Sequence, residues 1–150
     1  MLDGLFVTPA VDAITEALAS AKADGKLAVV GNAKLAIALG TSREVIPVGL
    51  PPRAARKLSR AIADLTTVEP GSLAAVIGTG LATAGDWEAT IRGWSRVVRD
   101  GGVIVLVDRG GDRGLRHEAS RRALCGGLSE IEQRHAGRVV ITSGLVSHLA

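Results

Sequence analysis

Hydrophobic residues follow two alternating patterns along this chain: short continuous apolar runs, and longer stretches with apolar residues three or four apart. The continuous runs predict buried strands, at 27–30, 44–48, 73–77 and 103–107. The helical spacing predicts amphipathic helices between them, at 9–23, 34–39, 52–65, 86–98 and 112–124. Thr8 should cap the first helix and Pro9 should lie in its first turn. Pro47 removes a backbone donor from the second strand, so we expect an end or irregularity there.

The last part of the chain has a different pattern. Polar and apolar residues alternate at 129–135 and 138–143 around Ala136-Gly137, which predicts an antiparallel hairpin. A very short strand is also expected at 66–68. Alternating strands and helices indicate an α/β, doubly wound, mostly parallel Rossmann-like sheet with helices on both faces. With 150 residues and no repeat or linker, we expect residues 1–150 to form a single domain.

Four segments in this order resemble class I S-adenosylmethionine-dependent methyltransferases. Residues 27–39 are similar to the family's first strand, turn and helix, and residues 43–58 to its second strand and helix. Residues 94–108 are similar to the entry into its fifth strand, with Gly-Gly, and residues 127–145 to its terminal hairpin. The resemblance implies that S-adenosylmethionine is the cofactor to consider. It places the cofactor-binding positions at Gly31, Asn32, Ala33, Gly49, Leu50 and Gly78.

The chain departs from the family at four places that would contact the cofactor. The first loop carries an acidic residue and three glycines in the family, whereas 30–34 reads Val-Gly-Asn-Ala-Lys. The second strand should end in a carboxylate for the ribose hydroxyls, but Gly49 and Leu50 stand there. Residues 65–73 leave little room for a third strand, with Glu69 as the only acid for the adenine side. After the fourth strand, an acidic or aromatic motif is replaced by Gly-Thr-Gly at 78–80.

Composition and charge exclude several other classes. Aromatic residues make up only 2% of the chain, namely Phe6, Trp87 and Trp94, which leaves little for stacking on bases. The chain has no apolar run of about 18 residues and no evident secretory signal. Its single cysteine, Cys125, cannot form an internal disulfide and is expected to be a buried small residue. We therefore expect a cytoplasmic protein, and a GC-rich, bacterial type of composition.

The candidate residues also have plain structural interpretations. The turn at 31–34 can bind a nucleotide at a helix start, or can simply be capped by Asn32. The turn at 78–80 can approach a ligand or only change the direction of the chain. Trp87 and Trp94 should pack in the core. The predicted helix at 52–65 has a basic face that consists of Arg53, Arg56, Lys57 and Arg60. This face is either solvated or contacts an acidic partner or nucleic-acid phosphates.

Three functional hypotheses follow. The first is a degenerate methyltransferase-like module, a pseudoenzyme that acts through protein–protein association or as a homo-oligomer. The second is an active methyltransferase for a small molecule, with an atypical S-adenosylmethionine pocket in which catalysis rests on proximity. The third is a nucleic-acid-binding module that uses the basic face at 53–60. We assign no catalytic and no metal-ligating residue, because the three histidines and Cys125 share no ligand spacing.

Overall fold

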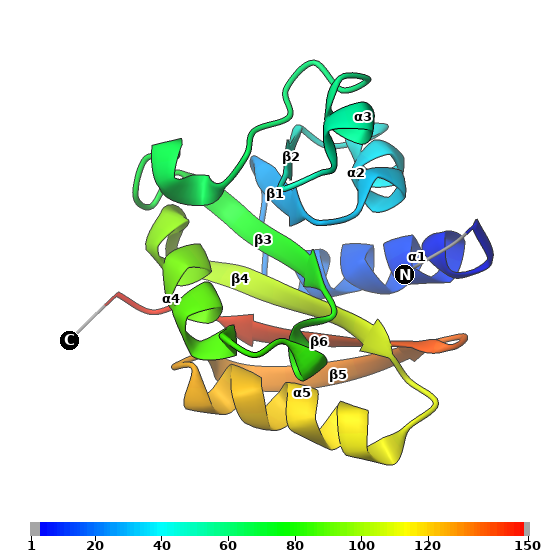
Figure 1. The fold of residues 1–150 in the computed structure, drawn as a ribbon. Helices are drawn as coiled ribbons and strands as arrows, with labels where there is room; N and C mark the ends of the chain where they lie inside the picture. Colours follow the sequence, from blue (N-terminus) through cyan, green and yellow to red (C-terminus); the bar gives the residue numbers. More distant parts are fainter. Residues whose placement is uncertain (1–3, 149–150) are drawn as a thin grey trace.

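A six-stranded mixed sheet forms the centre of the computed structural model, which describes residues 4–148 (Figure 1). The strand order is β2-β1-β3-β4-β6-β5. The strands are β1 (Leu27–Val30), β2 (Val45–Val48), β3 (Leu73–Thr79), β4 (Val98–Arg109), β5 (Ser129–Ala136) and β6 (Val139–Leu145). The first four strands are parallel, and β6 lies antiparallel between β4 and β5. The predicted doubly wound sheet with a C-terminal antiparallel hairpin is confirmed.

Helices cover both faces of this sheet. They are α1 (Gly4–Ser20), α2 (Ala33–Gly40), α3 (Pro52–Ala55), α4 (Trp87–Val97) and α5 (Arg113–Cys125), with 3₁₀ turns η1 (Leu65–Thr67) and η2 (Leu81–Thr83). Helices α1 and α2 pack on one face, and α4 and α5 on the other (Figure 1). The alternating residues of β3 show both layers, since Ile77 belongs to the α1/α2 core and Val76 to the α4/α5 core. Continuous apolar strands are explained by this double coverage.

The start of the first helix differs from the prediction. Thr8 was expected to cap it and Pro9 to lie in its first turn, but α1 begins at Gly4 and contains Pro9. A proline near the start of a helix removes at most one hydrogen bond to the preceding turn. Pro9 therefore lies near the start of the helix but does not define its first turn.

The predicted helix at 52–65 is also wrong, because α3 ends after one turn at Ala55. The chain instead returns to the sheet edge, where Ile62 forms an isolated parallel bridge with Val48. Ile62 N–H donates to the Pro47 carbonyl at 2.9 Å, and Gly49 N–H donates to the Ile62 carbonyl at 3.0 Å. Pairing the exposed edge of β2 outweighs the helical preference that the apolar spacing of this segment indicates.

The expected strand at 66–68 is a 3₁₀ turn instead. Asp64 caps η1, since its carboxylate accepts the Thr66 N–H at 2.9 Å and also the Thr66 hydroxyl. Aspartate bonds readily to the backbone two residues further on, which favours a turn over a strand. The sheet consequently ends at β2. The bridge at Ile62 lies where the family that the sequence resembles would have its third strand.

Candidate functional site

The parallel strands β1, β2, β3 and β4 end at the same edge of the sheet, where doubly wound folds bind ligands. The register sets Val30 level with Val48 on one side and with Gly78 on the other. The predicted positions at 31–33, 49–50 and 78 therefore lie together at this edge. The fold brings together the residues that the resemblance singled out.

The first of these turns is well ordered by its own hydrogen bonds. Gly31 has a φ of +79°, and its N–H donates to the Val48 carbonyl at 2.9 Å. Asn32 is buried and caps α2, since its side-chain oxygen accepts the Leu35 N–H at 2.9 Å. Ala33 is the first residue of α2. Asn32 thus caps the helix, which is the structural role that the sequence analysis gave as the alternative to nucleotide binding.

The second turn lies against residues 62–64. Gly49 has a φ of +66°, and a Cβ atom there would lie 3.7 Å from the Ala63 carbonyl oxygen. Leu50 follows it and is half-buried. A cavity of about 280 Å³ opens beside this turn. Its lining comes from the ends of β1 and β2, from residues 63–66 and from α4, and includes Val30, Gly49, Asp64, Thr90, Trp94 and Arg96.

Asp64 is a site residue that the sequence did not single out. It lines the cavity beside Gly49, although it lies 15 positions further along the chain. Hydrogen bonds from the Thr66 hydroxyl and backbone N–H hold the pKa of Asp64 below its usual range. A charged carboxylate is thus present near the end of β2, supplied by the segment that replaces a third strand. Only the bridge at Ile62, which the pattern did not predict, places it there.

Gly78 has a packing role in this structure. An added Cβ would lie 2.1 Å from the ring carbon Cη2 of Trp94, a side chain that is only 7% exposed. The indole therefore occupies the space that a side chain at 78 would need. Gly80, two residues later, has a φ of +75° and turns the chain into η2. Trp94 belongs to the α4/α5 core, which confirms its predicted packing role.

A second cavity, of about 220 Å³, lies at the ends of β3 and β4. Its lining includes Thr79, Gly80, Thr83, Asp108 and Arg109. Asp108 is only 6% exposed, and one of its carboxylate oxygens accepts the Ala82 N–H at 3.2 Å. The other oxygen is buried without a hydrogen-bond partner in the described part of the chain. Burial raises the pKa of Asp108, an effect that the Ala82 N–H and the charge of Arg122 partly oppose.

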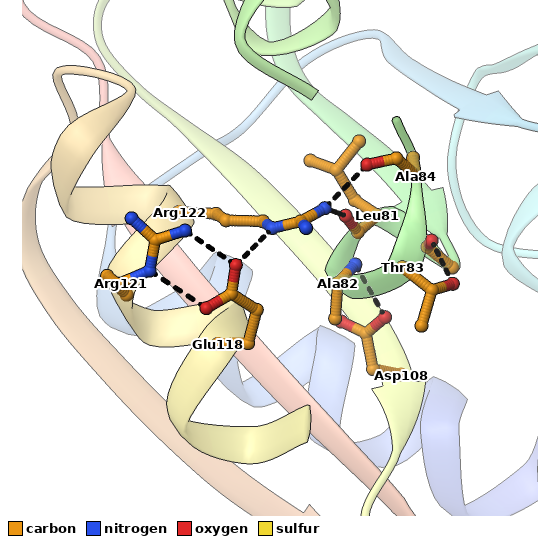
Figure 2. Close-up of polar contacts among 9 residues, drawn as sticks. Leu81, Ala82, Thr83, Ala84, Asp108, Glu118, Arg121 and Arg122 are labelled. Carbon is orange, nitrogen blue, oxygen red and sulfur yellow. Dashed lines mark hydrogen bonds and ion pairs between the residues drawn. The ribbon is translucent and has the colours of Figure 1, made fainter. Parts of the chain in front are cut away.

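The turn η2 is fixed from α5 by Arg122. Figure 2 shows its guanidinium bonded to the carbonyls of Leu81 and Ala84. Both hydrogen bonds are 2.7 Å long. Glu118 accepts hydrogen bonds from Arg121 and Arg122, which lower the pKa of Glu118 to about 2. Both guanidinium groups also lie over the Trp87 ring, at 5.6 and 5.3 Å from its centre. Arg122 of α5 thereby holds the turn that follows β3, and Trp87 of α4 contacts the same guanidinium.

Asp108→Asn should make stability less dependent on pH. An ordinary aspartate in the unfolded chain ionises near pH 4, whereas buried Asp108 retains its proton to higher pH. The native state therefore binds more protons above about pH 4, and the free energy of unfolding falls as pH rises through that window. The variant lacks this loss, so its stability relative to wild type should increase from acidic to neutral pH. Urea unfolding at both pH values measures it, and a pH-independent difference would contradict the expectation.

The basic residues at 53–60 do not form one helix face. Arg53 lies in α3, whereas Arg56 and Lys57 follow its end. Arg60 lies 2.7 Å from the Glu44 carboxylate at the edge of the sheet.

Cys125, predicted to be buried, is exposed at the end of α5. In residues 4–148, no three His, Cys, Asp or Glu side chains are grouped as metal ligands.

The helices of the described chain are all too short or too polar to cross a lipid bilayer.

The chain matches no protein-family model and no curated protein sequence. It is similar to solved methyltransferase structures. The candidate methyltransferase in complex with the Haloferax volcanii Trm112 activator has a TM-score of 0.69 at 14% identity, over 91% of this chain and 89% of that one. The T. thermophilus 16S rRNA N2 G1207 methyltransferase, in complex with AdoMet and guanosine, has a TM-score of 0.62 at 17% identity. The match covers 84% of this chain and 36% of that chain.

A geranyl diphosphate methyltransferase in complex with SAM has a TM-score of 0.62 at 15% identity, over 83% of this chain and 79% of that chain. This chain spans only 36%, 56% and 47% of the length of three such structures. At these identities the likeness establishes the fold. The chain has the class I S-adenosylmethionine-dependent methyltransferase fold, and the resemblance seen in the sequence is confirmed at that level.

Proposed function

We propose that this chain is a methyltransferase-like module that has lost efficient cofactor binding and acts by associating with another protein, as a scaffold or regulatory subunit. The packing of the fold is kept, whereas the residues that would hold the cofactor are not. One observation carries the proposal. Ile62 is hydrogen-bonded to Pro47 and Gly49 at the end of β2, and the cavity beside Gly49 is left with about 280 Å³.

That volume lies just below the range of about 300–1,000 Å³ in which small-molecule pockets are usually found. S-adenosylmethionine has both an adenosine part and a methionine part to accommodate. The backbone donors of the two glycine turns, Gly31 and Gly49, are already bonded to carbonyls of the protein. Gly49 also offers no carboxylate to the ribose hydroxyls, whose paired hydrogen bonds would be strong. These features support a module without cofactor turnover.

An active methyltransferase for a small molecule is the second candidate, and Asp64 is the observation that favours it. Asp64 lines the cavity that Gly49 also lines, and hydrogen bonds from Thr66 keep its carboxylate ionised by lowering its pKa. In this alternative Asp64 accepts the ribose hydroxyls in place of the missing strand-end acid. The chain would then position the cofactor and acceptor, and catalysis would rest on their alignment.

A nucleic-acid-binding module has less support. It needs several cations on one surface, but the predicted helix face is interrupted after Ala55. Arg60 is already paired with Glu44. Retention on DNA that declines steeply with salt, and that is abolished by reversing the charges of Arg53 and Arg56, would favour this alternative.

Calorimetric titration with S-adenosylmethionine tests the proposal. We expect binding weaker than about 1 mM, which corresponds to less than about 4 kcal/mol. Asp64→Asn is the matched variant, because it removes the charge but keeps a side chain of the same size. Micromolar binding by the wild type would overturn the proposal, and its loss in Asp64→Asn would identify the atypical pocket instead.

A further inference from the structure

A groove runs along the outer edge of β2. Its volume is about 360 Å³, and its lining comes from α2, from β2 and from the segment before Ile62, including Ile37, Val45, Pro47, Leu58 and Arg60. We call it the β2-edge groove. It lies outside the strand-end cavities described above and shares no lining residue with them.

The backbone along this groove can pair with another strand. Leu27 N–H donates to the Glu44 carbonyl and Gly31 N–H donates to the Val48 carbonyl, both at 2.9 Å. Backbone groups of alternate residues in a parallel strand face opposite sides, so the N–H and carbonyl of Val45 face away from β1. Among residues 4–148, neither group has a partner on that outer side. The parallel bridge between Val48 and Ile62 shows that an extended segment already fits further along this edge.

The groove also has an apolar surface. Ile37 is 55% exposed, and among the side chains of residues 8–148 it is one of two large hydrophobic ones with such exposure. Pro47 and half-buried Leu58 line the same groove. An edge strand beside an exposed apolar surface is the arrangement that binds extended peptides by adding a strand.

The charges next to the groove select the kind of partner. Arg56 and Lys57 are exposed and directly precede the lining residues 58–60, and exposed Arg53 lies in α3 just before them. In the described chain, no carboxylate lies within ion-pair distance of these three side chains. Glu44, the acid of the groove, is paired with Arg60 at 2.7 Å. The surface therefore complements a segment that carries carboxylates.

We propose that the β2-edge groove docks an extended acidic segment of a partner protein, which pairs with Val45 as an added strand. Its apolar side chains would contact Ile37 and Leu58, and its carboxylates would face Arg56 and Lys57. This inference rests on the proposed function in that it names the partner's chemistry and the place where it binds. It does not depend on whether S-adenosylmethionine binds at the strand ends.

Fluorescence anisotropy with defined peptides tests the docking. The probe is a fluorescein-labelled heptapeptide in which glutamate and valine alternate. One comparison peptide has lysine in place of glutamate, and another has the glutamate backbone nitrogens methylated. We expect saturable binding of the acidic peptide by the intact chain, and binding at least about tenfold weaker for both comparison peptides, about 1.4 kcal/mol. Equal binding of the acidic and lysine peptides would overturn the proposal, as would tolerance of N-methylation.

Surface variants locate the binding. Ile37→Asp, and Arg56→Glu combined with Lys57→Glu, should each weaken the acidic peptide by about tenfold. The matched control is Arg113→Glu with Arg138→Glu, an equal charge change at two exposed cations elsewhere, and it should retain most of the binding. Equal losses in the control would overturn the proposal. So would a wild-type dimer that Ile37→Asp dissociates, because the groove would then belong to a second copy of the chain.

The same variants separate this inference from the proposed function. Ile37 lies outside the strand-end cavity, so Ile37→Asp should leave any calorimetric response to S-adenosylmethionine unchanged. Tight cofactor binding together with peptide docking would overturn only the loss of cofactor binding. Weak cofactor binding without peptide docking would overturn only the groove.

Discussion

Gly78→Ala should destabilise the protein by about 3 kcal/mol, near the upper end of the range for overpacked cores. The added Cβ would lie 2.1 Å from Cη2 of Trp94, and 2.9 Å from two further carbons of its ring. The first of these contacts is more than 1 Å shorter than an ordinary van der Waals contact and the other two are about half an ångström shorter. The ring is rigid and almost fully buried. Urea unfolding followed by tryptophan fluorescence measures the change. A role for Gly78 in cofactor binding alone would leave the stability unchanged.

Gly93→Ala is the matched control for this substitution. Gly93 lies in α4 beside Trp94, and nothing lies within 4 Å of a Cβ added there. Alanine favours a helix over glycine by about 1 kcal/mol, so this variant should be slightly more stable than wild type. Trp94→Leu should relieve part of the cost of Gly78→Ala in a double-mutant cycle, because the two positions are in contact. Additive effects would contradict the packing explanation.

The parts of the fold that the sequence predicts correctly are those where local pattern and burial agree. The run Val103–Val107 is covered by helices on both faces and is apolar throughout, so its pattern identifies a strand without further information. The segment at 52–65 shows the opposite case. Its helical spacing is real, but the unpaired edge of β2 recruits Ile62 through two backbone hydrogen bonds. A requirement of the sheet edge cannot be read from residues within the segment itself.

The candidate site divides in the same way. The resemblance selected positions at the strand ends, and the register of β1 with its two neighbours brings them to one edge. The side chains that share this edge were not predictable. Asp64 reaches the cavity only because Ile62 bridges to Val48, and Asp108 is distinguished by burial rather than by its place in a motif. The glycine at 78 shows that a small residue at a strand end can be required by an indole 16 positions away.

Arg122→Met should destabilise the protein by about 2–3 kcal/mol, because it removes the charged donor from the Leu81 and Ala84 carbonyls and leaves the Leu81 carbonyl only its longer bond from the Ala84 N–H, at 3.3 Å. Figure 2 shows the Arg122 guanidinium bonded to the Leu81 and Ala84 carbonyls. Both bonds are 2.7 Å long, and the side chain of Arg122 is only 15% exposed. Methionine keeps much of the apolar part of the side chain, so the loss should report mainly the hydrogen bonds. The midpoint of urea unfolding measures this loss.

Arg121→Met is the control that separates these hydrogen bonds from the charges around Glu118. Arg121 pairs with the same Glu118 carboxylate as Arg122, through two hydrogen bonds, and lies over the same Trp87 ring. Its side chain, however, is 47% exposed, and these two bonds do not reach the carbonyls of η2. Exposed ion pairs contribute about 0–1 kcal/mol, so this variant should lose less than about 1 kcal/mol. Equal losses in the two variants would mean that the ion pairs and the indole contact, rather than the carbonyls of η2, hold the turn after β3 to α5.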